Sequence, residues 1–100
     1  MTIIQTTRDF VLYALPHMRG RLLDFGAGTS KYQPIILPHV QRYTAFDAKE
    51  APHIDVVGDV EVPPFSDGSF ETVLCNQVLE HVPHPQRVVS AIARLLVRGG

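Results

Sequence analysis

The sequence has few of the features that mark secreted, membrane-spanning or nucleic-acid-binding proteins. Its one cysteine, Cys75, cannot form an internal disulfide, so we expect a reducing compartment and place the protein in the cytoplasm. Nine Lys and Arg against ten Asp and Glu give a net charge of −1, and this balance argues against a nucleic-acid partner. The N-terminal apolar stretch 10–15 is too short to span a bilayer or to form an export signal, so we expect no membrane partner.

One short segment carries most of the functional signal. Residues 22–30 read L-L-D-F-G-A-G-T-S, an apolar strand that contains Asp24 and runs into a turn with Gly26 and Gly28. Because glycine has no Cβ, such a turn can adopt positive φ and let a ligand lie against the main chain.

A second acid follows at a spacing typical of nucleoside binding. The expected strand 41–47 ends on Asp47, nineteen residues after Gly28. An acid about 20 residues beyond a glycine turn binds ribose hydroxyls in dinucleotide-binding folds. We therefore predict that Asp47 accepts hydrogen bonds from the ribose of a nucleoside ligand, with a solvated strand-end acid as the alternative.

The third position of the turn separates two cofactor classes. A dinucleotide fingerprint, G-x-G-x-x-G, requires a last glycine where this chain has Lys31. An NAD-binding or nucleotide-sugar-binding domain is therefore disfavoured.

The turn instead resembles motif I of the class I S-adenosylmethionine (SAM) dependent methyltransferases, acid-x-G-x-G-x-G, with Ser30 in the place of the last glycine. Residues 55–70 are similar to the third strand and following loop of that family, G-D-x-x-x-L-P-F-x-D-x-S-F. Residues 71–82 contain the L-E-H-V segment of the type 11 subgroup. The last segment, 94–100, resembles R-x-L-x-P-G-G, with Arg98 where proline is usual.

The resemblance implies an α/β fold with a Rossmann-like, doubly wound and mostly parallel sheet of order 3-2-1-4. Residues 1–100 would form a single SAM-binding domain. It would be the N-terminal, cofactor-binding half of the family's sheet, 3-2-1-4-5-7-6, and would lack strands 5–7 and look incomplete at its C-terminus. We expect strands over 21–25, 41–47, 54–57 and 70–75, and helices over 31–37, ending before Pro38, and 85–97, capped by Gly99.

One connection and one strand in this scheme are unusual. Only the six residues 48–53 join the second and third strands, whereas a parallel crossover normally needs about a dozen, so we expect no helix there and one poorly covered sheet face. Strand 70–75 would become a sheet edge with unpaired backbone groups. We therefore expect a homodimer, or a partner chain, that covers this edge.

A cofactor site of eight residues follows from the resemblance: Asp24, Gly26, Gly28, Asp47, Asp59, Val60, Asn76 and Gln77. Gly26 and Gly28 would pack against the methionine part of SAM, with an ordinary tight turn as the alternative. Asp24 would fix the turn or reach the methionine ammonium through water.

The other side of this site would hold the adenine and the sulfonium. Asp59 and the N–H of Val60 would read the adenine ring, although an Asp after Gly is often only a turn former. Asn76 and Gln77 could meet the sulfonium end of the ligand or cap the next helix.

The implied function is methyl transfer from SAM to a small-molecule, lipid-linked or glycan acceptor. The alternative is a non-catalytic module of the same fold that binds SAM or a partner protein. His81 and His84 are the neutral-pH candidates for a general base, but no spacing assigns either, so the catalytic residue stays unknown. We expect no metal, because a third ligand with fitting spacing is missing, and weak or absent turnover by residues 1–100 alone.

Overall fold

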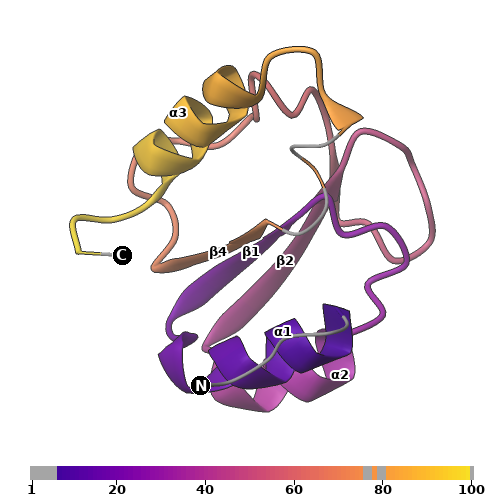
Figure 1. Cartoon of the computed structure of the whole chain (residues 1–100), viewed down its shortest axis with the longest axis vertical. Helices are drawn as coiled ribbons and strands as arrows, with labels where there is room; N and C mark the ends of the chain where they lie inside the picture. Colours follow the sequence, from indigo (N-terminus) through magenta and orange to yellow (C-terminus); the bar gives the residue numbers. More distant parts are fainter. Residues whose placement is uncertain (1–6, 76–77, 79–80, 100) are drawn as a thin grey trace.

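The computed structural model describes residues 7–75, 78 and 81–99, and these build a four-stranded parallel sheet (Figure 1). The strand order is β3-β2-β1-β4, which confirms the expected order 3-2-1-4. The strands are β1 (Arg21–Phe25), β2 (Arg42–Asp47), β3 (Val56–Val57) and β4 (Thr72–Cys75).

Alternate side chains of β1 pack on opposite faces of the sheet. Leu22 belongs to one buried cluster with Val11 and Ile36, while Leu23 belongs to a second cluster that includes Val88. A central parallel strand that is covered on both faces is expected to be an almost continuous apolar run. Asp24 interrupts that run and is nevertheless buried.

The helices form one layer on each side of the sheet, with α1 and α2 on one face and α3 on the other (Figure 1). Two of them continue directly into 3-10 turns. The bounds are α1 (Thr7–Ala14) with the turn Leu15–His17, α2 (Gln33–Ile36) with the turn Leu37–His39, and α3 (Pro85–Leu95). In the part of the chain that the structure describes, no helix is long and apolar enough to cross a membrane.

The expected end of the helix before Pro38 is confirmed, although α2 is shorter than the expected range 31–37. The chain leaves α2 at Ile36 and continues through Pro38 in the 3-10 turn. Proline fits there because it occupies the first residues of a new helical turn, whose N–H groups have no partner within the turn.

Helix α3 also ends two residues earlier than the expected range 85–97. Leu96 is extended, with ψ 139°, because it forms a parallel bridge with Phe70. Gly99 has φ 83° but lies beyond this end, so it is not the helix cap that the sequence predicted.

Strand β4 is shorter than the expected range 70–75 and begins at Thr72. Phe70 pairs instead with the segment that follows α3. Its N–H donates to the Leu95 carbonyl at 3.1 Å, and its carbonyl accepts from the Val97 N–H at 2.8 Å. The segment that follows α3 therefore lies beside Phe70, just before the start of β4.

Strand β3 contains only two of the four residues in the expected range 54–57. Asp55 is engaged with β2 in another way. Its carboxylate accepts from the Ala45 N–H at 2.8 Å, and its own N–H donates to the Ala45 carbonyl at 2.9 Å. This side-chain contact takes the place of regular strand pairing.

The short crossover 48–53 contains no helix, as predicted from its length. It is nevertheless tied to the domain, because the Ser30 hydroxyl donates to the His53 carbonyl at 3.2 Å. Ile54 then packs against the core on the α1 and α2 side. The expected poor covering is therefore limited to the end of this edge, where Val57 is 47% exposed.

Candidate functional site

A cavity of about 620 Å³ opens at the carboxyl ends of β1 and β2. In open parallel sheets this is the end at which ligands bind, and the volume is in the usual range for small-molecule sites. The cavity is lined by Gly26, Asp47, Ala48, Lys49, Val60, Val78, His81 and Val82. It therefore brings together three of the eight residues that the sequence assigns to the cofactor: Gly26, Asp47 and Val60.

The glycine turn owes its shape to two different constraints. Gly26 has φ 78°, and a Cβ at this position would overlap the Val78 side chain. Gly28 has φ 59° with open space around its Cβ position, so only the backbone conformation favours glycine there. The N–H groups of Gly26 and Ala27 both donate to the Phe46 carbonyl, at 2.8 and 3.0 Å, which anchors the turn to β2.

Asp47 is locked to this turn. Its Oδ2 accepts from the Gly28 N–H at 2.8 Å, and its Oδ1 accepts from the Lys49 N–H at 3.2 Å. Gly28 does not line the cavity itself but orients the acid that does. An ionised carboxylate has about four acceptor positions, so Asp47 can still receive ligand hydroxyls on both oxygens.

Asp24 lies in the core rather than on the cavity wall. It is 8% exposed and accepts a hydrogen bond from the Tyr43 hydroxyl. Burial raises the pKa of Asp24, the Tyr43 hydrogen bond opposes that rise, and the Asp47 charge adds to it. Burial, together with the hydrogen bond to Asp24, also raises the pKa of Tyr43.

The adenine side of the expected site is only partly assembled. Val60 lines the cavity, while the Asp59 carboxylate accepts from the Glu61 N–H at 2.8 Å and so stabilises a turn. Asn76 and Gln77 lie outside the described residues.

Sequence reasoning missed much of the apolar wall. Val78 and Val82 line the cavity, but neither was assigned to the site, although Val82 is the last residue of the L-E-H-V segment. Their place directly after a strand end is a signal that could have found them, since the loops at that end surround the ligand in this class of sheet.

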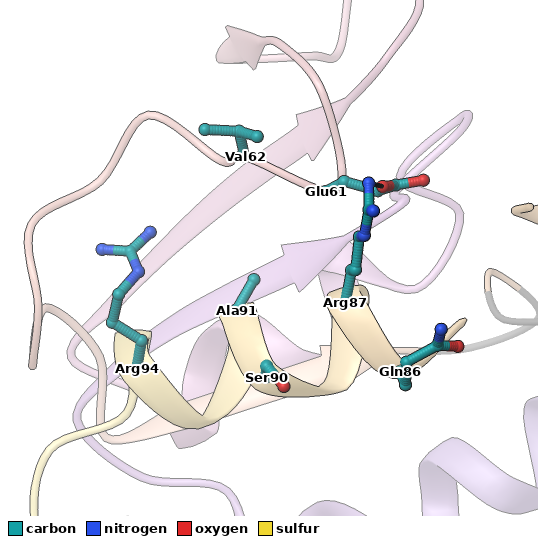
Figure 2. Close-up of a pocket in the computed structure, with 7 residues that line it drawn as sticks. All are labelled: Glu61, Val62, Gln86, Arg87, Ser90, Ala91 and Arg94. Carbon is teal, nitrogen blue, oxygen red and sulfur yellow. Dashed lines mark hydrogen bonds and ion pairs between the residues drawn. The ribbon is translucent and has the colours of Figure 1, made fainter. Parts of the chain in front are cut away.

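A second cavity of about 480 Å³ lies between α3 and the loop after β3 (Figure 2). Arg87, Ala91 and Arg94 point from the helix toward Glu61 and Val62. Arg87 Nη1 donates to Glu61 Oε1 at 3.4 Å within this cavity, whereas Arg94 pairs with Asp67 outside it.

The two candidate bases are separated by this arrangement. His81 lines the first cavity, whereas His84 Nδ1 lies 3.4 Å from Glu61 Oε2. Among the described residues, no three His, Cys, Asp or Glu side chains come together as metal ligands.

Comparison with curated proteins finds relatives that cover most of this chain. The ubiquinone biosynthesis O-methyltransferase of Xanthomonas oryzae pv. oryzae (strain PXO99A) is 32% identical over 109 residues, which cover 92% of this chain and 45% of that protein. The corresponding enzyme of Dechloromonas aromatica is 29% identical over 107 residues, which cover 92% of this chain and 46% of that protein. The chain thus spans about half the length of these relatives.

Solved structures agree on the fold. A candidate methyltransferase from Bacillus halodurans superposes with a TM-score of 0.72 at 29% identity, over 80% of this chain and 41% of that chain. Burkholderia thailandensis 1,6-didemethyltoxoflavin-N1-methyltransferase was solved with 1,6-didemethyltoxoflavin and S-adenosylhomocysteine bound. It superposes with a TM-score of 0.70 at 24% identity, over 88% of this chain and 45% of that chain. The family model for the methyltransferase domain matches residues 23–100, so the chain belongs to the methyltransferase domain family.

Proposed function

We propose that this chain is the cofactor-binding half of a SAM-dependent methyltransferase that acts on a small-molecule acceptor. The observation that carries the proposal is the junction of Asp47 and the glycine turn at the mouth of one cavity. The family match over residues 23–100 supports it independently.

The chemistry of the cavity fits this cofactor. Val60, Val78 and Val82 offer apolar surface for an adenine, and Asp47 offers acceptors for ribose hydroxyls. At Gly26 the backbone lines the cavity directly, where a Cβ would overlap a neighbouring side chain. When bound, SAM supplies a methyl group already activated by its sulfonium, so the protein needs mainly to orient the reactants and exclude water.

The acceptor in this proposal is a small molecule with a hydroxyl group. The support comes from the relatives that are named O-methyltransferases. A hydroxyl acceptor must lose a proton during transfer, and His81 is a neutral-pH base candidate on the cavity wall. We propose His81 rather than His84 for this role, because His84 faces Glu61 at the second cavity.

Isothermal titration with SAM, S-adenosylhomocysteine and NAD tests the cofactor. We expect the first two to bind and NAD to bind far more weakly, because Lys31 stands where a dinucleotide site needs glycine. Preferential binding of NAD would overturn the proposal. A radiolabelled-methyl assay with pooled metabolites then separates an enzyme from a non-catalytic SAM-binding module, which would bind without turnover in every natural form.

Assembly and location are further proposals. Among the described strands β4 is at the edge of the sheet, with half-buried Val73 and Cys75, and such an edge supports pairing with another chain. We expect a dimer in sedimentation velocity, and a monodisperse monomer at high concentration would refute this. The single cysteine supports a cytoplasmic location.

A further inference from the structure

The loop that follows β3 separates the two cavities of the domain. Val60 lines the first cavity, while the next two residues, Glu61 and Val62, line the second cavity beside α3 (Figure 2). The chain turns tightly at this point. Asp59 Oδ1 accepts from the Glu61 N–H at 2.8 Å, and the Asp59 carbonyl accepts from the Val62 N–H at 3.1 Å. Residues 59–62 therefore form one turn that borders both cavities.

The segment that leads into α3 borders the same two cavities. Val82 lines the first cavity and Arg87, in the first turn of α3, lines the second. His84 lies between them in the sequence, directly before the helix. Val60 and Val82 also pack against the same core cluster. The turn 59–62 and the start of α3 are therefore both part of the wall of the first cavity.

The Glu61 carboxylate joins these two parts of the wall. Its Oε1 lies 3.4 Å from Arg87 Nη1, and its Oε2 lies 3.4 Å from His84 Nδ1. The Glu61 side chain is only 17% exposed. A carboxylate that is largely withdrawn from water interacts more strongly with a nearby cation than an exposed one does, and an arginine stays charged at every physiological pH. Glu61 thus attracts the start of α3 toward the turn.

We propose that Glu61 is a positioning residue for the cofactor, which holds the turn 59–62 against the start of α3 and so sets the distance between the apolar walls that receive the adenine. The inference rests on the proposed function, because that function assigns Val60 and Val82 to the adenine. Glu61 acts through these two residues and does not touch the ligand. Dispersion contacts weaken steeply when a gap of less than 1 Å opens, so a small separation of the walls lowers affinity.

The test measures the affinities of S-adenosylhomocysteine and adenosine by calorimetry in Glu61→Gln, which removes the charge and keeps the shape. Partly exposed ion pairs contribute modestly, so we expect both ligands to bind about threefold more weakly, since both carry the adenine. Asp67→Asn is the matched control. It removes another acid of the same loop that pairs with an arginine of α3, Arg94 at 2.7 Å, but Asp67 lines neither cavity. It should change either affinity by less than about 1.5-fold.

Salt separates this electrostatic role from a general loosening of the fold. Raising NaCl from about 0.02 M to about 0.5 M screens the Glu61 contacts and should weaken adenosine binding by the wild type toward the affinity of Glu61→Gln. The uncharged adenosine should bind Glu61→Gln with almost the same affinity at both salt concentrations. An equal salt effect in the two proteins, or an equal loss in Asp67→Asn, would overturn the inference.

Charge reversal at Arg87 provides a second and independent arm. Arg87 is 64% exposed, so Arg87→Glu should fold even if Glu61→Gln does not. It places two acids beside each other, and we expect it to weaken both ligands about fivefold although Arg87 lies outside the first cavity. Adding Glu61→Lys restores an attractive pair in the opposite order and should bring both affinities back to within about twofold of the wild type. Failure of this double variant to recover would refute the role of Glu61.

The two proposals fail in different ways. If the wild-type chain binds neither S-adenosylhomocysteine nor adenosine, the proposed function is wrong and this inference falls with it. If the wild-type chain binds both, and Glu61→Gln and Arg87→Glu bind them equally well, the proposed function stands and the role of Glu61 is refuted.

Discussion

Ser30 occupies a motif position in a strained backbone conformation. It stands where motif I has its last glycine, and its φ of 54° lies in the left-handed region that glycine adopts freely. The hydroxyl bond to the His53 carbonyl offsets part of that strain. The sequence alone identified the departure from the motif, while its compensation became visible only in the structure.

Two substitutions at this residue should therefore differ. Ser30→Ala keeps the strained φ and loses the hydrogen bond, and we expect it to lower the free energy of unfolding by about 1 kcal/mol. Ser30→Gly loses the same bond but relieves a strain of about 1–2 kcal/mol, so it should stay close to wild type. Urea denaturation measures both, and an equal loss in the two variants would mean that the backbone at Ser30 is not strained.

Asp47 should be required for the cofactor and also support the fold. We expect Asp47→Ala to weaken S-adenosylhomocysteine binding by about 1.5–3 kcal/mol, because charge-assisted bonds to ribose hydroxyls are lost. The variant should also lose about 1 kcal/mol of stability, since the N–H groups of Gly28 and Lys49 lose their acceptor. Titration calorimetry and urea denaturation separate the two effects.

The matched control for this substitution is Glu50→Ala, an exposed acid on the adjoining crossover. It should leave both affinity and stability unchanged. If Asp47→Ala folds and binds as the wild type does, Asp47 does not belong to the site.

At the scale of elements, the loop between β3 and β4 is held to the sheet by aromatic packing and by α3. The Phe65 ring packs edge-on against Phe46 and Phe70, with centroids 5.5 and 5.2 Å apart. Arg94 of α3 donates to the Phe65 carbonyl at 2.9 Å, to Asp67 Oδ1 at 2.7 Å and to the Pro63 carbonyl at 3.3 Å. This arginine takes the place of regular secondary structure in fixing the loop.

Arg94 and Arg87 lie two turns apart on the same helix but should differ in their contribution to stability. Arg94→Ala removes bonds to two carbonyls and a carboxylate, and we expect a loss of about 1–2 kcal/mol. Arg87→Ala removes one long contact from a side chain that is 64% exposed, and should cost less than about 0.5 kcal/mol. Equal losses in thermal unfolding would show that the loop does not depend on Arg94.

At the scale of the whole molecule, two carboxyl groups shape the pH dependence of stability in opposite directions. Glu71 accepts from the Arg21 guanidinium at 2.6 and 3.0 Å, which joins the starts of β1 and β4 and lowers the pKa of Glu71 to about 2. Asp24 has a raised pKa because it is buried. The contribution of Asp24 to the free energy of unfolding therefore falls as the pH rises above the ordinary pKa of an Asp carboxyl. The contribution of Glu71 is fully present above the ordinary pKa of a Glu carboxyl.

The acid limb of the stability curve should therefore depend on Glu71. Its folded pKa lies below the ordinary value of 4.5, so its contribution is present above 4.5 and is lost as pH falls toward about 2. We expect Glu71→Gln to be less stable than wild type at pH 7, with the difference shrinking over that window. Thermal unfolding at several pH values tests this, and a constant difference would contradict the assignment.

The sequence by itself determined the class of fold and the strand order, and it assigned to the proposed site three residues that line one cavity: Gly26, Asp47 and Val60. These properties follow from local features, each made by residues close together along the chain. The features are the turn with Gly26 and Gly28, the acids near two strand ends, and four short motifs in order. The motifs therefore predicted the parallel sheet and assigned Asp47 to the ligand, and the length of the 48–53 crossover predicted that it contains no helix.

Only the tertiary structure decided which of these residues meet. Tyr43 reaches Asp24 because β1 and β2 lie side by side, and α3 ends at Leu95 because Leu96 pairs with Phe70. Val78 joins the cavity wall by packing over Gly26. These contacts join residues far apart in sequence, and no local pattern specifies them, since they depend on the packing of the whole domain.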